Sequence, residues 1–277
     1  MSENLLRDVI DIHIHTSPDV RARRLSDLAL AAEARRVGAR AIVIKSHIVT
    51  TMDRAAIARE AVPGIGVFGG IVLNPHVGGL NAVAVDAAIE LGAKLVWLPT
   101  SFSSNERKRQ GKIGGIETVA NGKVVPALLP ILKMIAEADI ALATGHLAPA
   151  ETLVVVEEAR KQGITKIVVN HPEWPSVDMS IDDQKRLLPF GVFFERCYAR
   201  SVGGRYDKNF RRNLDAMEAV GFDSTIVATD GGQVENPMWS EALAEYIDFL
   251  LQAGVPQATV DRMTKINPAI VLGLDEA

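Results

Sequence analysis

Short apolar runs rich in β-branched residues recur along the chain, and a longer segment with helix signals follows each of them. Eight runs have this character: 9–14, 40–45, 66–73, 94–98, 140–144, 166–169, 191–194 and 225–228. Continuous apolar runs are typical of parallel strands that are buried on both faces. The alternation of strand and helix predicts a parallel sheet, and eight such units predict a closed (β/α)8 TIM barrel of the α/β class. An open doubly wound sheet is the alternative.

The segments between these runs carry residues that begin and end helices. Helices are expected after Ser26, after Thr51, and over 82–91, 126–138, 149–162 and 207–220. Short polar side chains such as that of Ser26 accept hydrogen bonds from the free N–H groups of a first turn, and glycines such as Gly38 tolerate the left-handed conformation at a helix end. No Pro-, Ser- or Gly-rich linker divides the chain, so we expect a single domain over residues 1–277.

A long insertion separates the fourth apolar run from the next helix, over residues 100–126. Within it, two short β-like pieces flank Asn121 and Gly122, a dipeptide typical of two-residue hairpins. The loops that follow the strands of a barrel all lie at its C-terminal mouth. The insertion is therefore expected either to cover that mouth as a lid or to form a surface excursion.

Composition and charge exclude several classes of protein. The chain has 277 residues, 48% of them hydrophobic, and 30 basic and 34 acidic residues give a formal net charge of −4. This argues against a disordered chain and against nucleic-acid binding. No apolar stretch reaches the roughly 18 residues of a membrane span, the first residues lack the features of a signal peptide, and the single cysteine cannot form an intrachain disulfide. We expect a soluble, cytoplasmic protein that acts on a small molecule, with homo-oligomer formation left open.

All six histidines fall at or just after the carboxyl end of an expected strand. They are His13, His15, His47, His76, His146 and His171. Strand ends make up a small part of the chain, so scattered histidines would rarely all lie there. Because (β/α)8 enzymes build their active sites at this end of the barrel, the histidines predict a site at the mouth.

His13 and His15 are two residues apart on an expected strand, so both side chains point to the same side. Neutral imidazole is a good ligand for zinc and similar divalent ions. Asp230 ends the last apolar run, and in a closed barrel the eighth strand lies beside the first. The carboxylate of Asp230 is therefore expected to face the two histidines, where it can bind an ion, accept a proton from water, or do both in turn.

Together these motifs resemble the amidohydrolase superfamily of metal-dependent barrel hydrolases. The resemblance spans nearly the whole chain, and the segments that carry it are His13-Ile14-His15, Gly145-His146, Asn170-His171-Pro172, Thr229-Asp230 and Asn267-Pro268-Ala269. It implies a (β/α)8 barrel and a divalent metal, which we expect to be zinc. The metal ligands that it implies are His13, His15, His146, His171 and Asp230.

The fourth strand departs from the pattern of this superfamily. Two-metal members commonly carry a carboxylated lysine or a glutamate at its end, whereas here Lys94 stands at the start of the run and Thr100 follows its end. We therefore expect one ion rather than a bridged pair. Glu106 or Glu117 would have to reach in from the insertion to supply a bridging acid.

The residues expected to contact a substrate are Lys45, His47, His76 and Arg196. Lys45 follows a buried apolar run, where an ammonium is costly without a partner, so a clamp for a carboxylate or phosphate is favoured over a lysine that extends to water. His76 is either a substrate contact or a loop histidine. One of Glu195 and Arg196 should face the pocket because neighbours on a strand alternate sides, and a structural ion pair is the alternative for both. Cys197 is expected to be a small buried hydrophobic residue.

These residues favour a metal-dependent hydrolase that cleaves an amide, cyclic amide, lactone or ester bond in a small anionic substrate. The ion would lower the pKa of water towards about 7, and Asp230 would pass the proton of that water to the leaving group. His171 would hold a second metal position or stabilise the oxyanion. The alternatives are a mononuclear decarboxylase of the same superfamily, a lyase in which Lys45 forms a Schiff base, and a metal-binding barrel without enzymatic activity.

Overall fold

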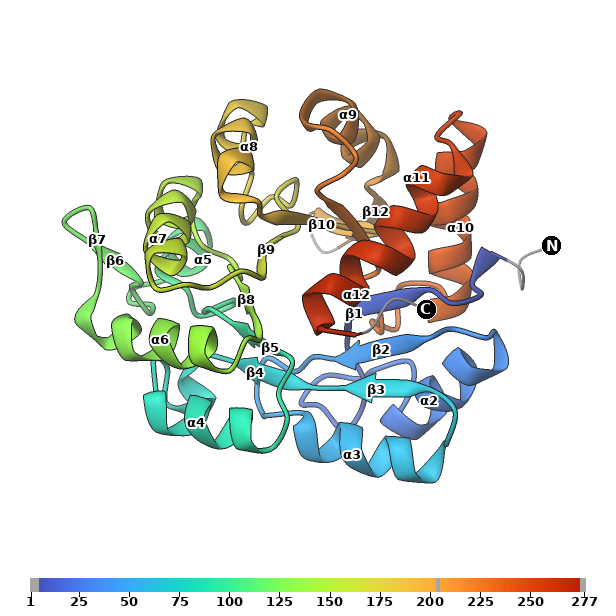
Figure 1. Ribbon diagram of the computed structural model, residues 1–277, viewed down its shortest axis with the longest axis horizontal. Helices are drawn as coiled ribbons and strands as arrows, with labels where there is room; N and C mark the ends of the chain where they lie inside the picture. The colour runs from blue at the N-terminus through green and yellow to red at the C-terminus, as the bar shows by residue number, and fades with distance from the viewer. Residues whose placement is uncertain (1–4, 203–204, 275–277) are drawn as a thin grey trace.

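The computed structural model describes residues 5–202 and 205–274, and its strands form a ring that the helices surround (Figure 1). In chain order the strands of the ring are β1 (Ile10–Ile14), β2 (Ala41–Ile44), β3 (Gly66–Phe68), β4 (Gly70–Val72), β5 (Leu95–Trp97), β8 (Ala141–Ala143), β9 (Ile167–Asn170), β10 (Phe193–Cys197) and β13 (Thr225–Ala228). Because β3 and β4 are two halves of one interrupted strand, the ring contains the eight strands that the apolar runs predict.

Parallel pairing connects the strands in chain order. One set of neighbours is β1-β2-β3, and the other runs from β4 through β5, β8, β9 and β10 to β13. The ring closes where Ile14 pairs with Gly231 and the backbone N–H of His15 donates to the carbonyl of Gly231 over 2.9 Å. The predicted (β/α)8 barrel is therefore confirmed, and the open doubly wound sheet is excluded.

The third strand changes partner at two adjacent glycines. β3 pairs with β2, whereas β4 pairs with β5. A Cβ atom added at Gly69 would overlap the backbone of Thr51, and one added at Gly70 would overlap the carbonyl of Leu95. Only glycine therefore allows the strand to pass this closely between its neighbours.

The helices that cover the ring are α2 (Asp27–Arg36), α3 (Met52–Ala61), α4 (Ala82–Glu90), α5 (Ser104–Arg109), α6 (Leu129–Glu137), α7 (Pro149–Lys161), α8 (Ile181–Leu187), α9 (Phe210–Val220), α10 (Trp239–Gln252), α11 (Gln257–Asp261) and α12 (Asn267–Leu272). The cap expected at Ser26 is present, since its side chain accepts from the N–H of Ala29 at the start of α2. Within the described part of the chain, every helix is too short or too polar to cross a bilayer.

The segment between β10 and α9 differs from the sequence-based expectation. A hairpin of β11 (Ala199–Val202) and β12 (Arg205–Lys208) follows β10, and α9 begins only at Phe210. A helix was expected from residue 207. The periodic apolar pattern that suggested it belongs to α9 alone, whose buried residues start at Phe210.

Side chains alternate between the inside and the outside of the ring. Ile10, Val43, Trp97 and Val168 belong to the apolar cluster that fills the barrel, whereas the intervening residues pack against the helices. The interior cluster also includes Ala269, Val271 and Leu272 of α12, the segment near the chain end that resembles the amidohydrolase superfamily. Burial of both faces explains why the strands are recognisable as continuous apolar runs.

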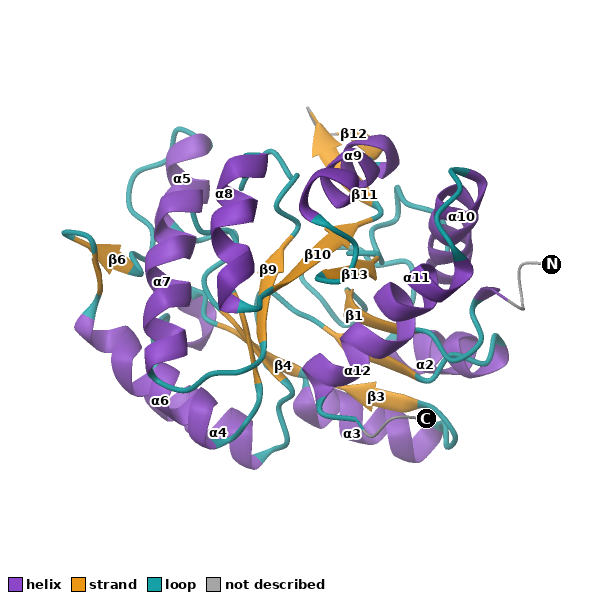
Figure 2. Ribbon diagram, turned by 45° about the horizontal axis from the view of Figure 1, so that its top comes forward, coloured by secondary structure: helices purple, strands orange, loops and turns teal. Residues whose placement is uncertain are grey.

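The insertion between β5 and α6 has two parts. The hairpin predicted at Asn121-Gly122 is present as β6 (Val119–Ala120) and β7 (Lys123–Val124), and both turn residues have positive φ. It contacts α7 and lies at the outer edge of the molecule (Figures 1 and 2). The first part, which contains α5, lies at the barrel mouth.

Candidate metal centre

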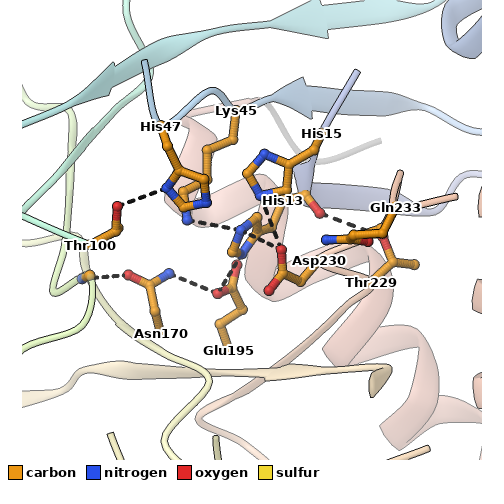
Figure 3. A network of polar contacts seen from close by, with 12 residues as sticks. His13, His15, Lys45, His47, Thr100, Asn170, Glu195, Thr229, Asp230 and Gln233 are labelled. Carbon is orange, nitrogen blue, oxygen red and sulfur yellow. Dashed lines mark hydrogen bonds and ion pairs between the residues drawn. The ribbon is translucent and has the colours of Figure 1, made fainter. Parts of the chain in front are cut away.

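An irregularity in β1 directs its two histidines into the mouth. Asp11 pairs with Ile42 and Ile14 with Ile44, so β1 has one more residue than β2 over the same distance. Asp11 is directed away from the histidines and accepts hydrogen bonds from Thr229 Oγ1 (2.6 Å) and Trp239 Nε1 (2.9 Å). After this bulge, His13 and His15 both face Asp230 (Figure 3).

Asp230 joins the two histidines of β1. Its Oδ1 lies 3.0 Å from Nε2 of His13 and 3.1 Å from Nε2 of His15. Burial opposes ionisation of Asp230, but the two imidazoles outweigh it and hold the pKa of this carboxyl well below its usual value. Asp230 also has a φ of 46°, a strained conformation that aims its side chain from the strand end. The predicted convergence of the three side chains is present in the structure.

Glu195 fixes the other side of the His13 ring. Its Oε2 lies 3.0 Å from His13 Nδ1 and accepts a hydrogen bond of 2.7 Å from Asn170 Nδ2. Burial alone would lower the pKa of His13, yet the carboxylates of Asp230 and Glu195 raise it to about 9. For the Glu195 carboxyl, burial acts in the other direction and would raise the pKa, but the charge of His13 lowers it to about 2. With Nδ1 bonded to Glu195, only Nε2 is directed at the mouth.

Arg196 does not contact the pocket, so its prediction as a substrate-binding residue is wrong. Its side chain points to the outer face of β10, where the guanidinium pairs with Glu173 and donates to Gln184 Oε1 over 3.0 Å. Alternation along the strand gives the inward position to Glu195. The structural ion pair is therefore the correct interpretation for Arg196.

His146 and His171 form the opposite wall of the site. Their ring centroids lie 4.9 Å apart, and the His171 ring lies 6.0 Å from that of His13. Both ring nitrogens of His171 are buried and have no hydrogen-bond partner among the described residues, and burial lowers the pKa of this ring to about 3. Its backbone φ is 24°, so this side chain too is held in a strained position. The five expected metal ligands thus lie at one mouth.

Hydrogen bonds connect the first part of the insertion to the wall that His146 and His171 form. Ser103 Oγ and Asn105 Nδ2 both donate to the carbonyl of His146, over 2.9 and 3.0 Å. Glu106 Oε2 lies 3.5 Å from His146 Nδ1, so this acid does reach in from the insertion. Glu117, the other acid considered, is exposed near the distant hairpin. The expected position over the mouth is confirmed for the α5 segment and is wrong for the hairpin.

Three expected substrate contacts lie along the cavity. Lys45 is buried at its base, with Nζ 2.9 Å from His13 Nε2, and burial lowers the pKa of its ammonium. The His47 ring stacks on His15 at 4.8 Å and its Nδ1 lies 2.8 Å from Thr100 Oγ1. His76 is exposed at the rim. All three line the cavity, as predicted, but their role with a substrate stays a prediction.

Cys197 is buried as expected, but its surroundings are polar. One ligand atom each from His13, Cys197 and Asp230 lies within 4.8 Å of the others. Burial, together with the nearby Glu195 and Asp230 carboxylates, raises the pKa of the thiol well above its usual value. The structure therefore contains a candidate group for a metal ion that includes a sulfur atom.

The cavity above these groups has a volume of about 800 Å³. Its lining includes Arg21, Arg107 and Lys112, while Arg23 is paired with Asp19. Neither Arg21 nor Lys112 forms an ion pair with another described residue, so the mouth presents uncompensated positive charge.

Trp174 lines the cavity and its ring stacks on His171 at 4.8 Å, a position that the sequence patterns do not indicate. The patterns also do not indicate that Asn170 donates to Glu195 and accepts from the backbone N–H of Gly145. Asn170 stands next to His171 in the Asn170-His171-Pro172 segment, and its inward position follows from the alternation along β9. Trp174 lies in a loop, where no periodic pattern indicates the direction of a side chain.

Comparison with solved structures identifies barrels of the same fold. An amidohydrolase from Pseudomonas aeruginosa has a TM-score of 0.63 at 13% identity, over 98% of this chain and 98% of that chain. A 2,6-dihydroxybenzoate decarboxylase from Rhizobium has a TM-score of 0.57 at 13% identity, over 98% of this chain and 100% of that chain. A dihydroorotase from Saccharomyces cerevisiae has a TM-score of 0.61 at 12% identity, over 98% of this chain and 85% of that chain. These are amidohydrolase-superfamily structures, so the fold that the resemblance implied is confirmed.

No curated protein matches the chain in sequence. A protein-family model, however, matches residues 8–195, which extend from just before β1 into β10 and include His13, His15, His146 and His171. Since this span is well over half of the chain, the chain belongs to the family of unknown function DUF6282.

Proposed function

We propose that this chain is a metal-dependent hydrolase that cleaves an amide, cyclic amide, lactone or ester bond in a small anionic substrate. The observation that carries the proposal is the convergence of His13 Nε2 and His15 Nε2 on Asp230 Oδ1, at 3.0 and 3.1 Å. Two imidazoles and a carboxylate at the C-terminal mouth of a barrel are a donor set suited to zinc.

Unpartnered polar atoms support the fit of a metal ion. His15 Nδ1 and both ring nitrogens of His171 are buried and make no hydrogen bond with a described residue. Buried polar atoms without partners are rare and indicate a missing ligand, water or ion. His13, His15 and Asp230 would hold the ion, with His146 and His171 available on the opposite wall.

A divalent ion bound there would supply Lewis acidity and would lower the pKa of a bound water towards neutrality. The Asp230 carboxylate, which His13 and His15 hold in its ionised form, would accept the proton that the attacking water loses and deliver it to the leaving group. Glu195 and Asn170 keep the His13 ring in one orientation. His171, on the opposite side of the cavity, stabilises negative charge that develops on the substrate oxygen.

The charge of the mouth supports an anionic substrate. Arg21, Arg107 and Lys112 lie around the entrance and Lys45 lies at the base, in a chain whose overall net charge is −4. A concave, positively charged cavity concentrates anions, and guanidinium groups suit carboxylates and phosphates.

Decarboxylation is the second candidate. Thr100 follows the fourth barrel strand, where a bridging acid would stand, and its hydroxyl contacts His47. A site with one ion is consistent with a decarboxylase, and one neighbour in fold is a decarboxylase. Release of carbon dioxide from a panel of carboxylic acids would distinguish this reaction from hydrolysis. A Schiff-base lyase would instead be trapped on Lys45 by borohydride with a carbonyl substrate.

Elemental analysis of the wild type and of a His13→Asn/His15→Asn variant tests the proposal. We expect a stoichiometric divalent metal in the wild type and its loss in the variant. Asp230→Asn should abolish turnover of esters, lactones and cyclic amides while much of the metal stays bound. Little metal in the wild type, even after zinc or manganese is supplied, would overturn the proposal.

A further inference from the structure

Cys197 faces the same interior as the metal-binding residues. It lies two positions after Glu195 on β10, and the outward Arg196 stands between them. The alternation of the strand therefore places the thiol and the Glu195 carboxylate on one wall. Cys197 is 1% exposed, and one ligand atom each from Cys197, His13 and Asp230 lies within 4.8 Å of the others.

Other polar atoms beside this group also lack partners. Glu195 Oε1 is buried and forms no hydrogen bond within the described part of the chain, although Oε2 of the same carboxylate contacts His13. The ring of His171 lies 6.0 Å from that of His13, and its two buried nitrogens have no partner in residues 5–202 and 205–274. The thiol therefore lies in a region that is rich in donor atoms and incompletely satisfied, which is typical of a binding site for a cation rather than of an apolar core.

We propose that Cys197 is a sulfur ligand of the ion that His13 and Asp230 bind. The inference rests on the proposed function, since it concerns the same metal centre. On binding, the thiol releases its proton to solvent and a sulfur–metal bond forms, with no change in oxidation state. Thiolate binds zinc and other soft or borderline ions strongly and magnesium weakly, so Cys197 directs the site towards zinc.

Cobalt(II) provides the test because a thiolate bound to cobalt gives an intense near-ultraviolet charge-transfer band. Cys197 is the single cysteine of the chain, so any thiolate band reports this residue. We expect the band in the cobalt-loaded wild type and its loss in Cys197→Ser, which retains cobalt through the histidines and Asp230. Ala228→Ser is the matched control, because Ala228 pairs with Cys197 on the neighbouring strand and its replacement leaves the thiol in place.

Zinc K-edge absorption provides a second readout that needs no variant. The zinc-loaded wild type should show a sulfur scatterer at about 2.3 Å beside nitrogen and oxygen at about 2.0–2.2 Å. If Cys197→Ser fails to fold, the wild-type spectra alone decide the question. Cobalt or zinc bound in stoichiometric amount without sulfur would overturn the role of Cys197 and leave the proposed function intact. A wild type that binds neither ion would overturn both.

Discussion

Lys45 Nζ lies 2.9 Å from Nε2 of His13, at the base of the cavity. Lys45 is 1% exposed, and no described carboxylate oxygen lies within 4.0 Å of its ammonium. The same His13 nitrogen lies 3.0 Å from Asp230 Oδ1. The amino group of Lys45 and the carboxylate of Asp230 therefore both contact Nε2 of His13. A positive charge on Lys45 at this position would repel a bound cation.

Replacement of this lysine should stabilise the fold. A buried ammonium without a carboxylate partner carries a desolvation cost, and methionine fills a similar volume, so Lys45→Met should raise the free energy of unfolding by about 1–3 kcal/mol. The variant should also bind zinc more tightly and turn over an anionic substrate more slowly. Urea denaturation and chelator competition measure the first two effects. Lys94→Met, at the opposite end of the barrel, is the control, and a Lys45→Met protein less stable than wild type would contradict the argument.

The contact between Glu195 and His13 should control metal affinity. Glu195→Gln keeps the shape of the side chain but removes the charge that holds the proton on His13 Nδ1. Loss of such an outer partner typically lowers metal affinity by roughly 10–100-fold. Chelator competition with zinc measures the change. Glu158→Gln on the surface of α7 should have no effect, and equal affinities of the Glu195 variant and wild type would show that the contact is only structural.

The metal-free protein should lose stability in acid. Burial lowers the pKa values of His15 and His171 to about 3, whereas unfolded histidine titrates near about 6.5. Between these values the unfolded chain binds more protons than the folded one. The stability that each neutral ring contributes is therefore complete above about pH 6.5 and lost as the pH falls towards 3, by up to about 1.4 kcal/mol per pH unit.

The pH dependence of stability that His13 contributes has the opposite sign. Its raised pKa of about 9 contributes stability that is complete below about pH 6.5 and lost as the pH rises through 9. Urea denaturation across this range, with chelator present, measures both effects. His171→Asn should reduce the acid slope by about one proton, while His76→Asn at the exposed rim should leave it unchanged. An acid slope in His171→Asn equal to that of the wild type would exclude His171 as its source.

Gly232 should tolerate no side chain. It has a φ of 101°, and an added Cβ atom would overlap the carbonyl oxygen of His15. Gly111 also has positive φ, but a Cβ atom added there would have no neighbouring atom within 4 Å. Gly111→Ala therefore isolates the cost of the backbone strain, about 1–2 kcal/mol. Gly232→Ala should lower the free energy of unfolding by about 1–3 kcal/mol more than Gly111→Ala does, because strand β1 must move to make room for the added atom. The same movement should weaken zinc binding. Equal losses in the two variants, measured with urea, would contradict this.

The sequence by itself determined the barrel and the place of its site. Each strand is buried on both faces, so a continuous apolar run marks it without knowledge of its neighbours. The histidines follow the carboxyl ends of these runs, and the parallel topology brings those ends together. For that reason the six histidines and Asp230 could be placed at one mouth before any contact was known. The resemblance to the amidohydrolase superfamily then selected His13, His15, His146, His171 and Asp230 among them.

Only the tertiary structure decided which side chains face that site. A strand pattern gives the period of two but leaves the phase open, so Glu195 and Arg196 could not be distinguished until the barrel placed β10 against β9 and β13. The bulge in β1 and the hairpin β11–β12 depend on pairing between strands. The closeness of Cys197 to His13 and Asp230 depends on ring closure, which brings β1 close to the last two strands of the ring. Such relationships depend on how strands pack around a closed ring, which local patterns do not encode.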